Sequence, residues 1–141
     1  MKSYVADANV LFSGIISGRD TYLKAFTNHA FYSPDFVLDE IQQYQSLLLQ
    51  KTKLDLENLR FFTLQLFSKL TIVPNFLIST NSYLLAFQLC KDVDEKDTTY
   101  LALAIEFDIE LVSKDEALVA HLRKNGFHKV LTLKEFLGNL E

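Results

Sequence analysis

Short apolar runs alternate along the chain with longer segments in which apolar residues recur every three or four positions. A short run rich in aliphatic and aromatic residues is typical of a buried strand, whereas the longer spacing is typical of a helix that packs by one face. The pattern predicts five strands, at Ser3–Ala6, Phe31–Ser33, Thr71–Pro74, Glu110–Ser113 and Lys129–Thr132.

Helical spacing fills the segments between these strands. In one of them Leu59, Phe62 and Leu66 fall on a single helical face. The predicted helices are one marked by Tyr22, Phe26 and His29, one from Pro34 to about Lys51, and further helices at Leu54–Leu70, Ser79–Lys91, Thr98–Phe107, Glu116–Asn125 and Leu133–Leu140. Strands that alternate with helices predict an α/β/α sandwich around a mainly parallel sheet of about five strands.

Length and composition narrow the class of protein. The 141 residues fit one domain, 1–141, and 49% apolar with 23% charged residues exclude global disorder. The longest apolar run, Tyr100–Ile105, is far too short to cross a membrane. Asp7 interrupts the stretch where a signal peptide needs apolar residues, and the single cysteine, Cys90, excludes a disulfide framework. We expect a soluble cytoplasmic protein without membrane association.

The acidic residues are unevenly distributed. The net charge is −4, so a partner that is a polyanion would have to be bound by local basic patches or through metal ions. Residues 1–70 carry seven bases and seven acids, while nine acids fall between Asp92 and Glu116, beside only Lys96 and Lys114. This segment forms either a solvated acidic face or a cation site.

Two acids directly follow predicted strands. Asp7 comes after the first strand, and Asp115 comes shortly after the fourth. In open parallel sheets, ligands collect beyond the carboxyl ends of the strands. Either residue could instead cap a helix, and Ser113-Lys114-Asp115-Glu116 has the form of a capping box.

Two further acids lie on apolar helical faces. Glu40 is four residues from both Phe36 and Tyr44, and Asp97 precedes apolar residues three and four positions on. A carboxylate on a face turned toward the core needs a partner, because burying an unpaired charge is costly. Alternatively, Asp94 and Asp97 are the cap and the first-turn acid of one helix, which explains Asp94 better than Asp97.

These four acids come from four separate segments, and no other catalytic group is evident. Brought together, their carboxylates would repel one another unless protons or divalent cations neutralised them. Ligands that are all oxygen favour Mg²⁺ or Mn²⁺ over zinc. No nucleophilic serine or cysteine motif occurs, and the three histidines, His29, His121 and His128, lack the spacing of a metal site.

Four segments together resemble the motifs of PIN domains. The run from Tyr4 to Leu11, with Asp7-Ala8-Asn9 at its centre, resembles the opening of that family. The other three segments, in the family's order, are Val37–Ile41, which resembles the helix with the second acid, Asp94–Ala104, which resembles the central motif, and Leu111–Leu118, with Ser113 where threonine is common. The resemblance therefore extends from Tyr4 to Leu118.

This resemblance implies an α/β/α fold and a ribonuclease that hydrolyses RNA phosphodiester bonds with Mg²⁺ or Mn²⁺. The implied catalytic and metal-binding residues are Asp7, Glu40, Asp97 and Asp115, with Asp94 as an accessory acid and Asn9 and Ser113 as orienting groups. Many bacterial relatives are VapC-type toxins that pair with an antitoxin and form homodimers, and the Phe and Leu residues of Leu54–Leu70 agree with a dimer. Lys114 stands where the family often has a small residue.

Three alternatives differ in what they require. A haloacid-dehalogenase-like phosphatase needs a second acid two residues after the first, where Asn9 stands. A receiver domain needs an aspartate at its middle strand, and Thr71–Pro74 supplies none. A PIN-fold binding module with little or no catalysis stays open. Basic residues that could contact RNA, or simply be solvated, are Arg19, Lys24, Lys51, Lys53 and Lys114.

Overall fold

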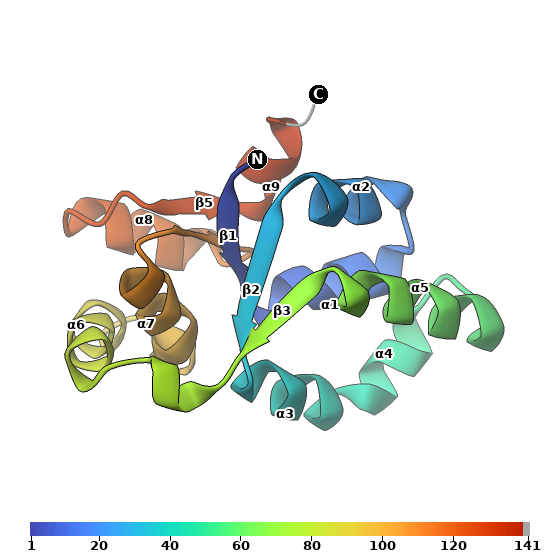
Figure 1. Cartoon of the computed structure of the whole chain (residues 1–141), viewed down its shortest axis with the longest axis horizontal. Helices are drawn as coiled ribbons and strands as arrows, with labels where there is room; N and C mark the ends of the chain where they lie inside the picture. The colour runs from blue at the N-terminus through green and yellow to red at the C-terminus, as the bar shows by residue number, and fades with distance from the viewer. Residues whose placement is uncertain (140–141) are drawn as a thin grey trace.

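Five parallel strands form one sheet in the computed structural model, which describes residues 1–139 (Figure 1). The strands are β1 (Ser3–Ala6), β2 (Ala30–Pro34), β3 (Leu70–Val73), β4 (Glu110–Ser113) and β5 (Val130–Thr132). Their order across the sheet is β3-β2-β1-β4-β5, and every neighbouring pair runs parallel. The predicted α/β/α class is therefore confirmed, with all strands parallel.

Helices connect all of these strands. They are α1 (Ala8–Ser17), α2 (Asp20–Asn28), α3 (Phe36–Gln43), α4 (Gln45–Lys51), α5 (Leu56–Ser68), α6 (Thr80–Cys90), α7 (Thr98–Phe107), α8 (Glu116–Lys124) and α9 (Leu133–Gly138), with short 3₁₀ turns η1 (Asn75–Leu77) and η2 (Glu95–Asp97). None of the helices within residues 1–139 is both long and apolar enough to span a membrane. The predicted end of the last helix, Leu140, lies outside the described residues.

The helices cover both faces of the sheet. Figure 1 shows α1, α2 and α5 on one side and α6, α7 and α8 on the other. Helix α7 packs across β1, β2 and β4, and its residues 100–104 are all buried. Its outer side is covered by α6. The longest apolar run in the sequence is therefore a helix buried on both sides.

The strand order creates a crevice between β1 and β4. From β1 the chain proceeds outward to β2 and β3, and then returns to the opposite side of β1 to form β4. After β1 and after β4 the chain turns to opposite faces of the sheet, so the two connections move apart beyond the carboxyl ends of these strands. Ligands bind at this position in such folds. Ala6 pairs with Val112 near these ends, so the residues that follow both strands meet at the crevice.

Two helical segments differ from the sequence prediction. The single helix predicted from Pro34 to about Lys51 is wrong, because the chain forms α3 and α4 with a break at Tyr44. Both helices pack on α1, and the Tyr44 ring lies edge-on to Phe12 of α1, with ring centroids 5.6 Å apart. Tertiary packing on α1 accounts for a break that no glycine or proline marks. Helix α1 itself was not among the predicted elements.

The end of α1 depends on a glycine. Gly18 has φ of 61°, and its amide donates to the Gly14 carbonyl to close the helix. A Cβ atom at Gly18 would lie 2.7 Å from Leu54 Cδ1. Both the left-handed backbone and the close approach of Leu54 therefore require glycine here.

Candidate metal centre

Asp7 is the most deeply buried acid of the crevice. It directly follows β1, is only 3% exposed, and caps α1 by accepting a hydrogen bond from the Val10 amide at 3.0 Å. The pKa of Asp7 is raised to about 6, chiefly by burial and also by the charges of Glu40 and Asp115, against hydrogen bonds with Val10 and Ser113 that lower it. The capping prediction and a position at the crevice are thus both correct for Asp7, because one carboxylate oxygen serves the helix.

Asp115 occupies the equivalent place after β4. Its Oδ1 accepts from the Leu118 amide at 3.0 Å and so caps α8. The buried Ser113 hydroxyl accepts from the Asp115 amide at 3.1 Å, which fixes the backbone between the strand and the helix. Ser113 therefore orients Asp115 through its main chain, and it also contacts Asp7 through a hydrogen bond.

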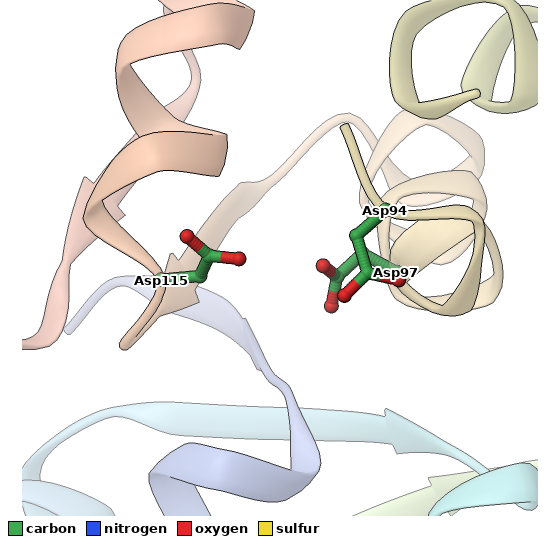
Figure 2. A group of neighbouring side chains, drawn as sticks. All are labelled: Asp94, Asp97 and Asp115. Carbon is green, nitrogen blue, oxygen red and sulfur yellow. The ribbon is translucent and has the colours of Figure 1, made fainter. Parts of the chain in front are cut away.

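Asp94 and Asp97 come from the turn before α7. Asp94 caps the 3₁₀ turn η2 by accepting from the Lys96 amide at 2.9 Å, and Asp97 ends that turn. Because a 3₁₀ turn has three residues, side chains three apart lie on the same side. The two carboxylates consequently sit close together and point toward the crevice (Figure 2).

Three of these acids converge on one point. Asp94, Asp97 and Asp115 each offer one carboxylate oxygen, and these oxygens lie within 4.8 Å of one another. Figure 2 shows Asp115 facing Asp94 and Asp97 across the gap between α8 and η2. Within residues 1–139 no other group of three acidic, histidine or cysteine side chains meets this condition. Asp94, expected as an accessory residue, belongs to the tightest group, while Asp7 and Glu40 lie outside it.

The charges in the crevice are strongly coupled. The pKa of Asp97 is raised to about 7, chiefly by burial and also by the negative charges of Asp7, Asp94, Asp115 and Glu40. No lysine or arginine forms an ion pair with any of these acids among the described residues, where the ion pairs are Arg123–Glu135 and Lys129–Asp108. The acids therefore repel one another without an internal counter-charge.

Glu40 reaches the crevice from α3 and is held by a tyrosine. The Tyr100 hydroxyl of α7 donates a hydrogen bond to Glu40 Oε1. Tyr100 is 2% exposed, and burial together with the neighbouring Glu40 raises the pKa of its hydroxyl, so it stays a donor. The sequence analysis did not assign Tyr100 a role, although its position three residues after Asp97, on the same helical face, was the available signal.

A cavity of about 660 Å³ opens beside the acids. Glu40, Asp94 and Asp97 line it, and so does the exposed Asn9 at the start of α1. Of the basic residues expected to contact RNA, Lys51 and Lys114 line this cavity, as does Lys96. Arg19 and Lys24 line a separate hollow next to α2, and Lys53 is exposed.

The histidines and the cysteine take no part in this group. His29 accepts a hydrogen bond from the Lys2 amide and packs on Tyr4, while His121 contacts Asn125. Cys90 is buried, and burial raises the pKa of its thiol to about 12. Among the described residues, none of them belongs to the group formed by Asp94, Asp97 and Asp115.

The donor chemistry of the crevice fits a hard divalent cation. All the converging ligands are carboxylate oxygens, which Mg²⁺ and Mn²⁺ prefer. Burial, and after it the neighbouring carboxylates, raises the pKa of Asp7 and of Asp97, and a bound cation would offset both effects. The residues present therefore suit a metal ion held by oxygen ligands alone.

Comparisons with known proteins agree with this geometry. Residues 5–132 match the family model of the PIN domain, whereas no curated protein sequence matches the chain. The crystal structure of PAE2754 from Pyrobaculum aerophilum is similar with a TM-score of 0.67 at 15% identity, over 99% of this chain and 89% of that one. VapBC2 from Rickettsia felis, solved with a DNA fragment from their promoter, is similar with a TM-score of 0.59 at 18% identity, over 92% and 98%. At these identities the shared property is the fold.

Proposed function

This chain belongs to the PIN-domain family, and on that premise we propose that it is a metal-dependent endoribonuclease that hydrolyses RNA phosphodiester bonds. The observation that carries the proposal is the meeting of acids from distant segments at the crevice between β1 and β4. These acids have no ion-pair partner among the described residues, and burial together with neighbouring carboxylates raises the pKa of Asp7 and of Asp97, which supports a cation as the missing partner. A solvated acidic face would leave Asp94, Asp97 and Asp115 exposed, whereas all three are half-buried.

The proposed cofactor is Mg²⁺ or Mn²⁺, and the residues that would hold it are Asp7, Glu40, Asp97 and Asp115, with Asp94. Bound there, the cation supplies activation of a water molecule and stabilisation of charge on the phosphate. The side chains of Asp7 and Asp115 would be rigid ligands, because one carboxylate oxygen of each accepts the hydrogen bond that caps a helix. Tyr100 fixes Glu40 through one oxygen and leaves the other free.

Cleavage of a labelled single-stranded RNA, with and without Mn²⁺, tests this function. We expect wild-type cleavage only with the metal, and we expect Asp7→Asn to lower the rate by at least about 100-fold, since the variant removes a charge that no neighbour can replace. Asp20→Asn, an exposed aspartate at the start of α2, is the matched control and should retain the wild-type rate. Metal binding without any cleavage would instead favour the binding-module alternative.

We also propose that the protein is the toxin of a toxin–antitoxin pair and acts in the cytoplasm, where cellular RNA is accessible. The support is the family and the likeness in fold to VapBC2. Expression of the wild-type chain should arrest growth of a host cell, whereas Asp7→Asn should not. A wild-type chain that cleaves RNA in vitro but leaves growth unchanged would contradict the toxin role alone.

Two helices carry exposed apolar side chains that support a homodimer and an antitoxin partner. On α5, Phe61 and Leu64 lie opposite the buried face, and on α6 Leu84 and Leu85 do the same. Large exposed apolar residues grouped on one helix face mark interfaces. We expect light scattering to give a dimer mass, and either Phe61→Glu with Leu64→Glu or Leu84→Glu with Leu85→Glu to produce monomers. A monomeric wild type would refute the dimer.

A further inference from the structure

The cavity beside the acids continues into an apolar recess. Its wall is formed by Phe12 and Ile16 of α1, Tyr22 of α2, and Tyr44, Leu47 and Leu48 at α4, and we call these six residues the stacking recess. The same cavity is also lined by Glu40, Asp94 and Asp97. A ligand that fills it therefore meets both carboxylates and an apolar surface that includes three aromatic rings.

Tyr44 is the accessible aromatic ring of this recess. It is 38% exposed, in contrast to the buried Tyr22, and its ring is supported edge-on by Phe12 at 85°. Tyr44 follows Glu40 by one helical turn, and its amide donates to the Glu40 carbonyl at 3.3 Å. Side chains four apart on a helix have Cβ atoms about 5–6 Å apart. The Tyr44 side chain therefore lies next to Glu40.

Lysines give the cavity a second chemical character. Lys51, Lys96 and Lys114 line it, and none of them forms an ion pair with an acid among residues 1–139, although carboxylates line the same cavity. Lys51 is on α4, the helix that supplies Leu47 and Leu48, whereas Lys114 immediately precedes Asp115. Ammonium groups from two separate segments beside aromatic rings complement a ligand that carries anionic groups next to a planar ring.

We propose that the stacking recess is a nucleotide subsite, in which one unpaired base of a single-stranded nucleic acid stacks on Tyr44 while Lys51 and Lys114 contact the adjoining phosphates. Aromatic side chains bind bases in this way, and a base enters such a recess only when it is not stacked in a duplex. The subsite rests on the proposed nuclease function, because it places the base beside the acids that would act on the neighbouring phosphate. Tyr44 then determines where the strand is cut relative to that base.

Binding of a fluorescent single-stranded oligoribonucleotide, measured by anisotropy with Ca²⁺ in place of Mn²⁺, tests the subsite without relying on cleavage. Tyr44→Ala should weaken binding by about 5- to 150-fold, the range for loss of one base–aromatic stack. Tyr44→Phe keeps the ring and should bind within about twofold of wild type. Phe76→Ala removes the 83% exposed ring of η1 and is the matched control, which should bind like wild type.

Two further measurements separate the possible outcomes. Lys51→Ala should reduce the slope of log affinity against log salt by about 0.7, as expected for one phosphate contact on a single strand. The same sequence as a duplex should bind equally to wild type and Tyr44→Ala. Equal single-strand affinity of wild type and Tyr44→Ala would overturn the subsite, even if the protein cleaves RNA. Loss of a protein partner from Tyr44→Ala with unchanged RNA affinity would also overturn it, whereas Tyr44-dependent binding without metal-dependent cleavage would refute the nuclease function alone.

Discussion

Asp97→Asn removes one charge from the acidic crevice without changing the volume of the side chain. Its pKa is raised from 3.8 to about 7, chiefly by burial and by the charges of Asp7 and Asp94. Three pKa units at about 1.4 kcal/mol each amount to about 4 kcal/mol of destabilisation when Asp97 is ionised. Because the side chain is partly solvent-accessible, screening reduces this, and we expect Asp97→Asn to stabilise the metal-free protein by about 2 kcal/mol at pH 8.

The stability gained by Asp97→Asn should increase as pH rises. Below pH 3.8 the carboxyl is protonated in both the folded and the unfolded chain, so the substitution changes little. Between pH 3.8 and about 7 the unfolded chain loses the proton first, and the wild type loses stability relative to the variant as pH rises. Above pH 7 the full difference is present, which corresponds to a melting temperature about 8 °C higher for the variant.

Metal should act in the opposite sense on the same pair of proteins. A cation that binds only the folded chain stabilises it by about 2.7 kcal/mol at 100 times its dissociation constant. Wild type should therefore melt about 10 °C higher at that Mn²⁺ concentration, and Asp97→Asn should gain much less at the same concentration. Thermal melts of both proteins at pH 4.5 and pH 8, with and without Mn²⁺, measure the effect of the substitution and the effect of the metal at each pH.

The control for these melts is Asp92→Asn, which removes an exposed aspartate from the same loop. It should change stability by no more than about 0.5 kcal/mol and leave the response to Mn²⁺ intact. Equal responses of wild type and Asp97→Asn to Mn²⁺ would show that Asp97 is not a ligand. A stability gain that is the same at pH 4.5 and pH 8 would refute the electrostatic reasoning itself.

Three other substitutions follow from single contacts. Tyr100→Phe removes the hydrogen bond to Glu40, so Mn²⁺ affinity measured by calorimetry should fall by about 3- to 30-fold, while unchanged affinity would contradict the positioning role. Glu135→Gln should lower the free energy of unfolding at pH 7 by about 0.5 kcal/mol, because the Arg123 side chain holds the pKa of Glu135 at about 2. This loss should disappear as pH falls from 4.5 toward 2, and an unchanged loss in thermal melts at acid pH would contradict the ion-pair reasoning. Gly18→Ala should cost at least about 1–2 kcal/mol in urea unfolding, and a neutral result would show that the chain relaxes there.

The sequence located the sheet and the acids that follow its strands well. Parallel strands are short buried runs with few alternatives, and their carboxyl ends share one edge, so Asp7 and Asp115 could be placed near each other before the structure was known. The apolar face that carries Glu40 likewise placed this acid toward the core. These inferences depend on local periodicity, which a single sequence contains.

The periodicity of apolar residues could not predict contacts between segments that are distant in the sequence. The break at Tyr44 is imposed by packing on α1, and no residue within the 34–51 segment marks it. The hydrogen bond between Tyr100 and Glu40 joins residues 60 positions apart on different helices. The close grouping of Asp94 with Asp97 depends on a 3₁₀ turn, whereas the sequence offered Asp94 only as a helix cap or as an accessory acid. In each case the missing information was the tertiary arrangement.

The central position of β1 in the sheet also sets the order in which the crevice can form during synthesis. Asp7 leaves the ribosome before β4 and Asp115, its neighbours at the crevice, which emerge more than 100 residues later. At about 5–20 residues per second this delay is roughly 5–20 s. A nascent chain that does not yet extend to Asp115 contains Asp7 but has no crevice. The acids are therefore assembled only after Asp115 has been synthesised, and a translation product truncated before Asp115 lacks the complete centre.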